Sequence, residues 1–267
     1  MTELAKRFVT ASVLIPMVLL GIFWGGLPFL LLVLAAIALG EGEFFRLMEA
    51  KGVVPLRRVG ILCGISLGIS VYFRGDSIVA TGFTAVILLL MISQLRRRSV
   101  EGAIATISTT LLGVLYVAWL LSHAILLRNS ENGLGIFYLV LVLAATYLGD
   151  TGAYFVGRQW GRHKLLPLIS PKKSWEGLVG GIFASVVAVF IVRWIFRSDM
   201  GTISCGILGV LLSVGGLLGD LAESLFKREA QVKDSGGLFP GHGGLLDRVD
   251  SLLFTLPIAY YYIKLCL

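Results

Sequence analysis

Two aspartates lie three residues apart in the stretch HGGLLDRVDS, His242 to Ser251, directly before the last apolar run of the chain. Because three residues span less than one helical turn, Asp247 and Asp250 would share one face of a helix. Carboxylates held together repel each other unless a cation lies between them. A third carboxylate, Asp220, lies inside an apolar stretch, where its charge is costly unless it is paired or binds a metal. The sequence therefore predicts a cation site at these three aspartates.

The residue types near the aspartates favour magnesium as that cation. Mg²⁺ prefers oxygen ligands and commonly takes one or two carboxylates together with substrate phosphates. The three cysteines show no paired spacing of the kind that zinc sites use. Several cations accompany the carboxylates in sequence: Lys172, Lys173, Lys227, Arg228, Lys233 and Arg248. Mg²⁺ surrounded by lysine and arginine is typical of phosphoryl or nucleotidyl transfer. We expect Mg²⁺ as the cofactor, and the presence of a second cation is left open.

A helix carrying Asp220 would place Ser224 and Lys227 on the same face, at positions i+4 and i+7. A salt-bridged helix end is the alternative, and it explains Glu223 better than it explains Asp220. The loop that follows contains five glycines and a proline, and glycines allow a backbone to approach a bulky anion closely. It lacks the G-x-x-x-x-G-K-[ST] pattern of a P-loop, so the glycines alone indicate little.

The elements that must position these residues are membrane helices. Of the 267 residues, 57% are hydrophobic and 15% are charged, against about 25% charged residues in average globular chains. Mean hydropathy is +0.89, and apolar runs of about 20 residues, each able to cross a bilayer, recur throughout. We expect an all-α, polytopic integral membrane protein with about nine spans. These spans are 8–25, 28–45, 57–73, 77–95, 103–127, 134–157, 175–196, 203–226 and 250–266.

The distribution of lysine and arginine predicts the orientation, because cytoplasmic loops carry an excess of both. Most of the 23 basic residues fall on one side if the N-terminus is cytoplasmic. The net charge of +7 then faces anionic headgroups, and no aromatic-interleaved basic surface suggests nucleic acid. We expect residues 1–100 to serve packing and lipid contact, 101–133 to form a middle span, and 134–267 to carry the catalytic site. Gly60, Gly64 and Gly68 recur every fourth residue, which predicts close helix packing.

The stretch SLFKREAQVKDSGGLFPGHGGLLDRVD, Ser224 to Asp250, resembles the signature of the phosphatidate cytidylyltransferases, or CDP-diacylglycerol synthases. GDTGAYFVGRQWGRHKL and SPKKSWEG resemble two further blocks of that family, so the resemblance covers roughly residues 145–255. It implies a reaction of CTP with phosphatidic acid that gives CDP-diacylglycerol and pyrophosphate. It also implies a homodimer. We expect the protein in the cell (inner) membrane, and the predicted orientation places the active site toward the cytoplasm.

Together, the chemistry and the resemblance predict a role for each candidate residue. We expect Asp220, Asp247 and Asp250 to bind the metal, and Lys227 and Arg228 to act with them in catalysis. For His242 we expect a structural role or a hydrogen bond to phosphate, and Asp150 is either a fourth acidic site residue or a helix cap. The predicted substrate-binding set comprises Lys172, Lys173, Ser174, Ser224, Lys233, Asp234, His242, Arg248 and Asp150.

Two other functions fit parts of the pattern. Intramembrane carboxylates and glycine-rich breaks also occur in ion-coupled transporters. Against a transporter, no two halves of the chain show matching interrupted helices, and the acids concentrate at one face. A CDP-alcohol phosphotransferase would carry a D-G-x2-A-R motif, which is missing here.

Overall fold

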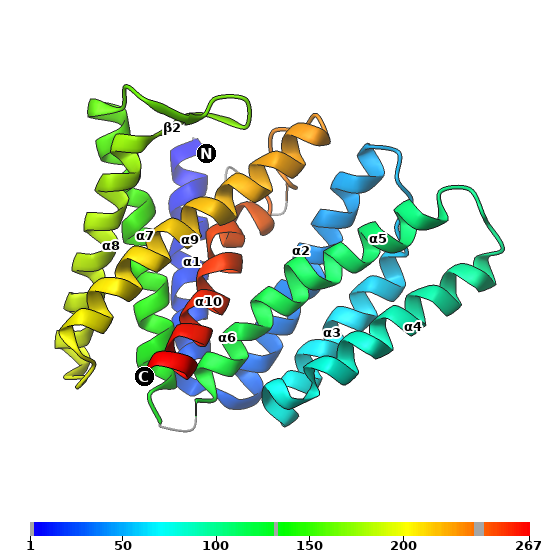
Figure 1. Cartoon of the computed structure of the whole chain (residues 1–267), viewed down its shortest axis with the longest axis horizontal. Coiled ribbons are helices and arrows are strands. Elements are labelled where there is room, and N and C mark those ends of the chain that lie inside the picture. The colour runs from blue at the N-terminus through cyan, green and yellow to red at the C-terminus, as the bar shows by residue number, and fades with distance from the viewer. Residues whose placement is uncertain (1–2, 131–132, 238–242) are drawn as a thin grey trace. The chain divides into compact units, whose positions relative to one another are not determined.

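The computed structural model describes residues 3–130, 133–237 and 243–267, and this part of the chain is almost entirely helical (Figure 1). The helices are α1 (Glu3–Trp24), α2 (Gly26–Ala50), α3 (Arg57–Arg74), α4 (Val79–Arg97), α5 (Ala103–Gly113), α6 (Leu120–Arg128), α7 (Gly135–Trp160), α8 (Trp175–Phe196), α9 (Thr202–Glu229) and α10 (Leu246–Cys266). A 3₁₀ turn (Gly75–Ile78) joins α3 to α4, and a π-helical turn (Val114–Trp119) joins α5 to α6. The strands β1 (Lys164–Leu166) and β2 (Ser170–Ser174) form one antiparallel hairpin.

Long apolar helices confirm the predicted class of protein. Within the described residues, six helical segments are long and apolar enough to cross a membrane. They are Gly26–Ala50, Arg57–Arg97, Ala103–Arg128, Gly135–Trp160, Trp175–Phe196 and Thr202–Glu229. Apart from the end residues Gly25 and Leu134, each of the nine predicted spans falls on helical backbone, and the 41-residue segment Arg57–Arg97 contains two of them, in α3 and α4. The fold is therefore that of a multi-pass helical membrane protein, and the count of nine crossings stays a prediction.

The chain forms two compact units, which are not continuous in sequence. The first unit comprises Met1–Asn129 and Phe226–Arg248, and the second comprises Ser130–Leu225 and Val249–Leu267. The segment around the glycine-rich loop thus belongs to the same unit as the first 129 residues. The division of roles at residues 100 and 133 stays a prediction.

In the first unit, α2 packs closely against α3. The repeated glycines of α3 make this possible, because a side chain on Gly60 would collide with Phe45 and one on Gly64 would collide with Glu41. Close packing through the glycine repeat is confirmed. At the C-terminal end of α9, Phe226 meets the aromatic rings of Phe44 on α2 and of Tyr116, with ring centroids 5.5 and 5.2 Å away. These contacts place the start of the 226–248 segment against α2.

In the second unit, helix pairs approach closely at glycines, which have no side chain to keep the backbones apart. A side chain on Gly152 of α7 would collide with Ala184 and the Gly180 backbone of α8. A side chain on Gly219 of α9 would collide with the backbone of Asp250 on α10. The Thr146 hydroxyl donates to Thr255 Oγ1 at 3.0 Å and ties α7 to α10. Such contacts bring α7, α9 and α10 together around Asp220.

Candidate active site

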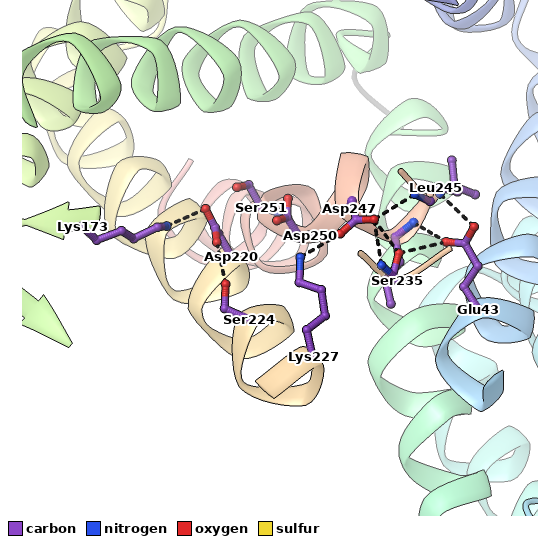
Figure 2. A network of polar contacts seen from close by, with 12 residues as sticks. Glu43, Lys173, Asp220, Ser224, Lys227, Ser235, Leu245, Asp247, Asp250 and Ser251 are labelled. Atoms are coloured by element: carbon purple, nitrogen blue, oxygen red, sulfur yellow. Dashed lines mark hydrogen bonds and ion pairs between the residues drawn. The ribbon is translucent and has the colours of Figure 1, made fainter. Parts of the chain in front are cut away.

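Asp247, in the first turn of α10, gathers donors from the loop that precedes it (Figure 2). Lys227 Nζ lies 2.7 Å from its Oδ1. Its Oδ2 accepts hydrogen bonds from the backbone N–H and the hydroxyl of Ser235, both at 2.9 Å, and from the Gly244 N–H at 2.8 Å. A carboxylate offers about four acceptor positions, two on each oxygen, so the three loop donors fully use Oδ2, and Oδ1 keeps one position beside Lys227. Asp247 therefore fixes the two ends of the glycine-rich loop.

These donors also affect the ionisation of Asp247. Burial by itself raises the pKa of the carboxyl group. Hydrogen bonds from Lys227, from the Gly244 N–H and from the Ser235 N–H, together with the Lys227 charge, outweigh burial and lower the pKa below its ordinary value of 3.8. Asp247 is an anion at neutral pH.

Glu43, on α2, is the second carboxylate that contacts this loop, and it is only 1% exposed. Its Oε1 accepts from the Leu245 N–H at 3.0 Å and its Oε2 from the Leu246 N–H at 2.8 Å. Because α10 begins at Leu246, these N–H groups have no acceptor within the helix. A carboxylate there also interacts favourably with the helix dipole. Glu43 thus caps α10 from α2, a role that the sequence analysis did not predict.

Ser235 joins the two carboxylates. Its hydroxyl lies 2.9 Å from Asp247 Oδ2 and 3.3 Å from Glu43 Oε2, and its single proton serves one of them at a time. Gly244 must lack a side chain, because a Cβ there would collide with the Ser235 hydroxyl and the Glu43 carboxylate. We refer to Glu43, Lys227, Ser235 and Asp247 as the Asp247 group, which lies wholly in the first unit.

Asp220, on α9, is paired differently (Figure 2). Lys173 Nζ, at the end of β2, lies 2.6 Å from its Oδ2. The Ser224 hydroxyl, one turn along α9, donates to its Oδ1 at 3.2 Å. The Asp220 side chain is 34% exposed, and that of Lys173 is 20% exposed. Two donors leave about half of the acceptor positions of this carboxylate for another ligand.

Asp150 and Asp250 also belong to the second unit. The Asp150 side chain hydrogen-bonds to Ser251 and interacts electrostatically with Lys173 and Asp220. It lies well inside α7, so it caps no helix, and of its two predicted roles only that of an acidic site residue fits this position. Asp250 Oδ1 accepts from the Ser251 N–H at 2.6 Å. We refer to Asp150, Lys173, Asp220 and Ser224 as the Asp220 group.

The remaining candidates lie elsewhere. Ser174 is 3% exposed, and its hydroxyl accepts from the Gly177 N–H at 3.1 Å as the N-cap of α8, which gives it a structural role. His242 lies outside the described residues. Exposed positions are occupied by Lys172, Arg228, Lys233, Asp234 and Arg248. Across the described ranges, no group of three or more His, Cys, Asp or Glu side chains is arranged to hold a metal ion.

Comparison with known proteins adds a nearly full-length match. The model of the cytidylyltransferase family matches residues 5–266. A phosphatidate cytidylyltransferase of Synechocystis sp. is 32% identical over 98% of this chain and 97% of its own length. One of Bacillus subtilis is 33% identical over 99% of both chains. One of Haemophilus influenzae reaches 44% identity over 48% of this chain and 46% of its own. These similarities give no support to an ion-coupled transporter.

Proposed function

Because the chain belongs to the cytidylyltransferase family, we propose that it makes CDP-diacylglycerol and pyrophosphate from CTP and phosphatidic acid. The observation that carries this proposal is the match over nearly the whole chain to proteins named phosphatidate cytidylyltransferase. The two carboxylate–lysine groups support it, because such groups suit the handling of phosphates in an otherwise apolar protein.

The proposed reaction is a substitution at phosphorus. An oxygen of the lipid phosphate forms a bond to the α-phosphorus of CTP, and the bond from that phosphorus to the β-phosphate oxygen breaks. Pyrophosphate leaves with the electron pair of the broken bond. A lipid phosphate is already ionised near pH 7, so the attack requires no general base. The residues of the chain therefore act by orienting the substrates and by balancing the negative charge that gathers on the leaving group.

The chemistry of the carboxylates fits Mg²⁺, which takes oxygen ligands. Asp220 retains an acceptor position on each oxygen beyond its two donors, whereas the Oδ2 of Asp247 is fully used by the loop and its Oδ1 is paired with Lys227. We therefore assign Asp220 and Asp250 as the residues that would hold Mg²⁺. Asp247 stays a predicted third ligand, through the acceptor position that its Oδ1 keeps beside Lys227. When bound, Mg²⁺ supplies positive charge to the phosphate oxygens of the reaction.

The exposed cations are assigned to the substrates' phosphates. Arg228 and Lys233 follow α9 closely in sequence, and Arg248 lies at the start of α10. An arginine side chain can hold two phosphate oxygens at once, whereas a lysine acts as a point charge. Lys227 is 15% exposed and paired with Asp247, so we assign it to ordering the loop. We assign Lys173 to the lipid phosphate, which it would bind after releasing its ion pair with Asp220.

We place this reaction at the cytoplasmic face of the cell (inner) membrane, with nine crossings, a cytoplasmic N-terminus and a homodimeric assembly. The excess of lysine and arginine on one side of the predicted topology supports this orientation. The homodimer rests on the family resemblance alone.

The test is a reconstituted reaction. Protein purified in detergent is incubated with CTP, phosphatidic acid and Mg²⁺, and pyrophosphate and the lipid product are both measured. We expect product only when all three components are present, and loss of product after chelation of the metal. Pyrophosphate release without the lipid, or a lipid product that forms equally well from other nucleoside triphosphates, would contradict the proposal.

A further inference from the structure

The β1–β2 hairpin is the only strand structure among the described residues, and it connects two membrane helices. It leaves the C-terminal end of α7 and enters the N-terminal end of α8, both long and apolar enough to cross a bilayer. The hairpin therefore begins within a few residues of the membrane surface. Trp160 and Trp175, at these two helix ends, are 62% and 57% exposed. Exposed tryptophan at helix ends is typical of the membrane–water interface.

Specific contacts hold the base of the hairpin. The backbone N–H of Trp175 donates to the His163 carbonyl at 2.9 Å, and His163 Nδ1 lies 2.6 Å from the Glu176 carboxylate. Lys173, on β2, pairs with Asp220. Figure 1 shows the hairpin running across the end of the α7–α8 pair rather than continuing the direction of the two helices. A fixed hairpin in this direction is suited to lie along a membrane surface.

The tip of the hairpin is apolar and exposed. It contains Leu166, Pro167, Leu168 and Ile169, and Leu168 is 95% exposed. Leu166 is 43% exposed. A two-stranded hairpin has no second layer against which to bury such side chains. Exposed leucines at the end of a held hairpin therefore form a small apolar surface that an apolar partner can cover.

The charges on either side of the tip indicate which partner fits. Arg162, Lys164 and Lys172 are exposed, and the segment from 161 to 174 contains no acidic residue. A leucine tip between cations matches the boundary between acyl chains and anionic headgroups, where each basic residue adds to the attraction. A second copy of the chain, meeting this hairpin through the same surface, would bring like charges together.

We propose that the hairpin is a membrane-surface element. Its leucine tip enters the acyl–headgroup boundary of the bilayer that α7 and α8 cross, and Arg162, Lys164 and Lys172 bind anionic headgroups. Lys173 is thereby held at headgroup height. This inference rests on the membrane helices and on the hairpin, and is independent of the catalytic proposal.

The experiment places an environment-sensitive fluorophore on the tip. In a Cys266→Ser background, which leaves two buried cysteines, Leu168→Cys is labelled with a nitrobenzoxadiazole dye and reconstituted into nanodiscs. We expect a blue shift of the emission relative to detergent, and a loss of intensity with nitroxide-labelled acyl chains. The matched control is Gly237→Cys, an exposed position in the loop after α9, which should show a smaller shift and less quenching. Unlabelled Cys266→Ser protein gives the background.

A second comparison tests the cations. Nanodiscs with anionic lipid should quench the Leu168→Cys label more than nanodiscs of phosphatidylcholine alone, and Lys164→Gln with Lys172→Gln should remove that difference. Emission typical of water, with no quenching in either lipid, would overturn the proposal. A blue shift without quenching by nitroxide lipids would also overturn it, because the tip would then contact protein. Neither measurement uses turnover, so failure here is distinguishable from failure of the proposed reaction.

Discussion

The Asp247 group and the Asp220 group contain the same chemical parts, a carboxylate with a lysine and a serine, but they use them differently. Three of the four hydrogen bonds that Asp247 accepts come from the loop, namely from the Ser235 and Gly244 N–H groups and the Ser235 hydroxyl. Among the described residues, the hydrogen bond and the ion pair of Asp220 come from two side chains, those of Ser224 and Lys173. One carboxylate therefore maintains a backbone shape, while the other is held by side chains that can exchange.

This difference indicates that Asp220 is more available to a ligand than Asp247. Displacing Lys173 from Asp220 requires one flexible side chain to move. Displacing the donors of Asp247 would unfasten the glycine-rich loop and, through Ser235, disturb its link to Glu43. Loss of the first carboxylate should impair chemistry in a folded protein, and loss of the second should impair the fold of the loop.

The largest expected effect is on catalysis in the Asp220 group. Asp220→Asn keeps the size of the side chain but removes the charge that would balance a cation, so we expect a rate loss of at least about 10²-fold. The thermal unfolding temperature should remain close to that of the unchanged protein. Turnover is measured over a Mg²⁺ titration, with Ser224→Ala as the control that keeps the charge. If the Asp220→Asn protein unfolds at a much lower temperature, or keeps its activity, then Asp220 does not serve catalysis in the way that distinguishes it from Asp247.

Glu43 should have the largest effect on stability. Glu43→Ala leaves two N–H groups at the start of α10 without their acceptor, and we expect a loss of about 3 kcal/mol in the free energy of unfolding. Glu43→Gln keeps one acceptor and should recover part of this loss. The matched control is Glu49→Ala, which breaks an exposed pair with Arg57 at 3.8 Å, worth about 0–1 kcal/mol. Denaturant titration in detergent measures all three variants, and equal losses for Glu43→Ala and Glu49→Ala would contradict the capping role.

The two ion pairs should also differ in coupling. Lys227 and Asp247 are 15% and 10% exposed, so removing one partner leaves a largely buried charge. We expect Lys227→Met and Asp247→Asn to be non-additive, with a coupling free energy of about 1–3 kcal/mol in a double-mutant cycle. The same cycle on Lys173 and Asp220 should give less, because this pair is more exposed. A stronger coupling there would reverse the assignment of the two groups.

The smallest expected effect is on the pH dependence of the unfolding temperature. A carboxylate whose folded-state pKa lies below its ordinary value of 3.8 stabilises the protein fully above that value, and this contribution is lost as pH falls through the folded-state pKa. The difference in unfolding temperature between unchanged protein and Asp247→Asn should therefore stay constant from about pH 8 to pH 5 and shrink only below about pH 4. A difference that disappears near pH 6 would mean that Asp247 has a raised pKa.

Hydropathy predicted the helices well, because each span is a local property of about 20 residues. All nine predicted spans lie on helical backbone except for one end residue in each of two spans. Asp220, Ser224 and Lys227 could be placed on one helix for the same reason, since their spacing alone assigns the face. The two units could not be predicted, because residues 226–248 pack with the first 129 residues through contacts across the sequence.

Glu43 was missed because its partners are about 200 positions away, with sequence separations of 192, 202 and 203 residues. A signal was present in LGEGEFF, since an acidic residue inside an apolar span usually has a specific partner. The sequence analysis did not include it among the candidates. The hairpin was missed for another reason: β1 has three residues and β2 five, which is too short for a periodic pattern, and β2 contains Pro171.

The distance in sequence between Glu43 and its donors has a consequence for how the protein is made. Helix α2 is synthesised first, and Leu246 follows 203 residues later. At about 5–20 residues per second, the carboxylate waits roughly 10 to 40 s for the N–H groups that it will bind. Insertion of α2 therefore takes place with a carboxylate that lacks these partners. Its cost if ionised lies below the roughly 2.5–3.5 kcal/mol of a charge at the centre of a span, because Glu43 lies near the end of α2. The cost is offset only when the last helix arrives, so Glu43 couples completion of the chain to the final packing of its first unit.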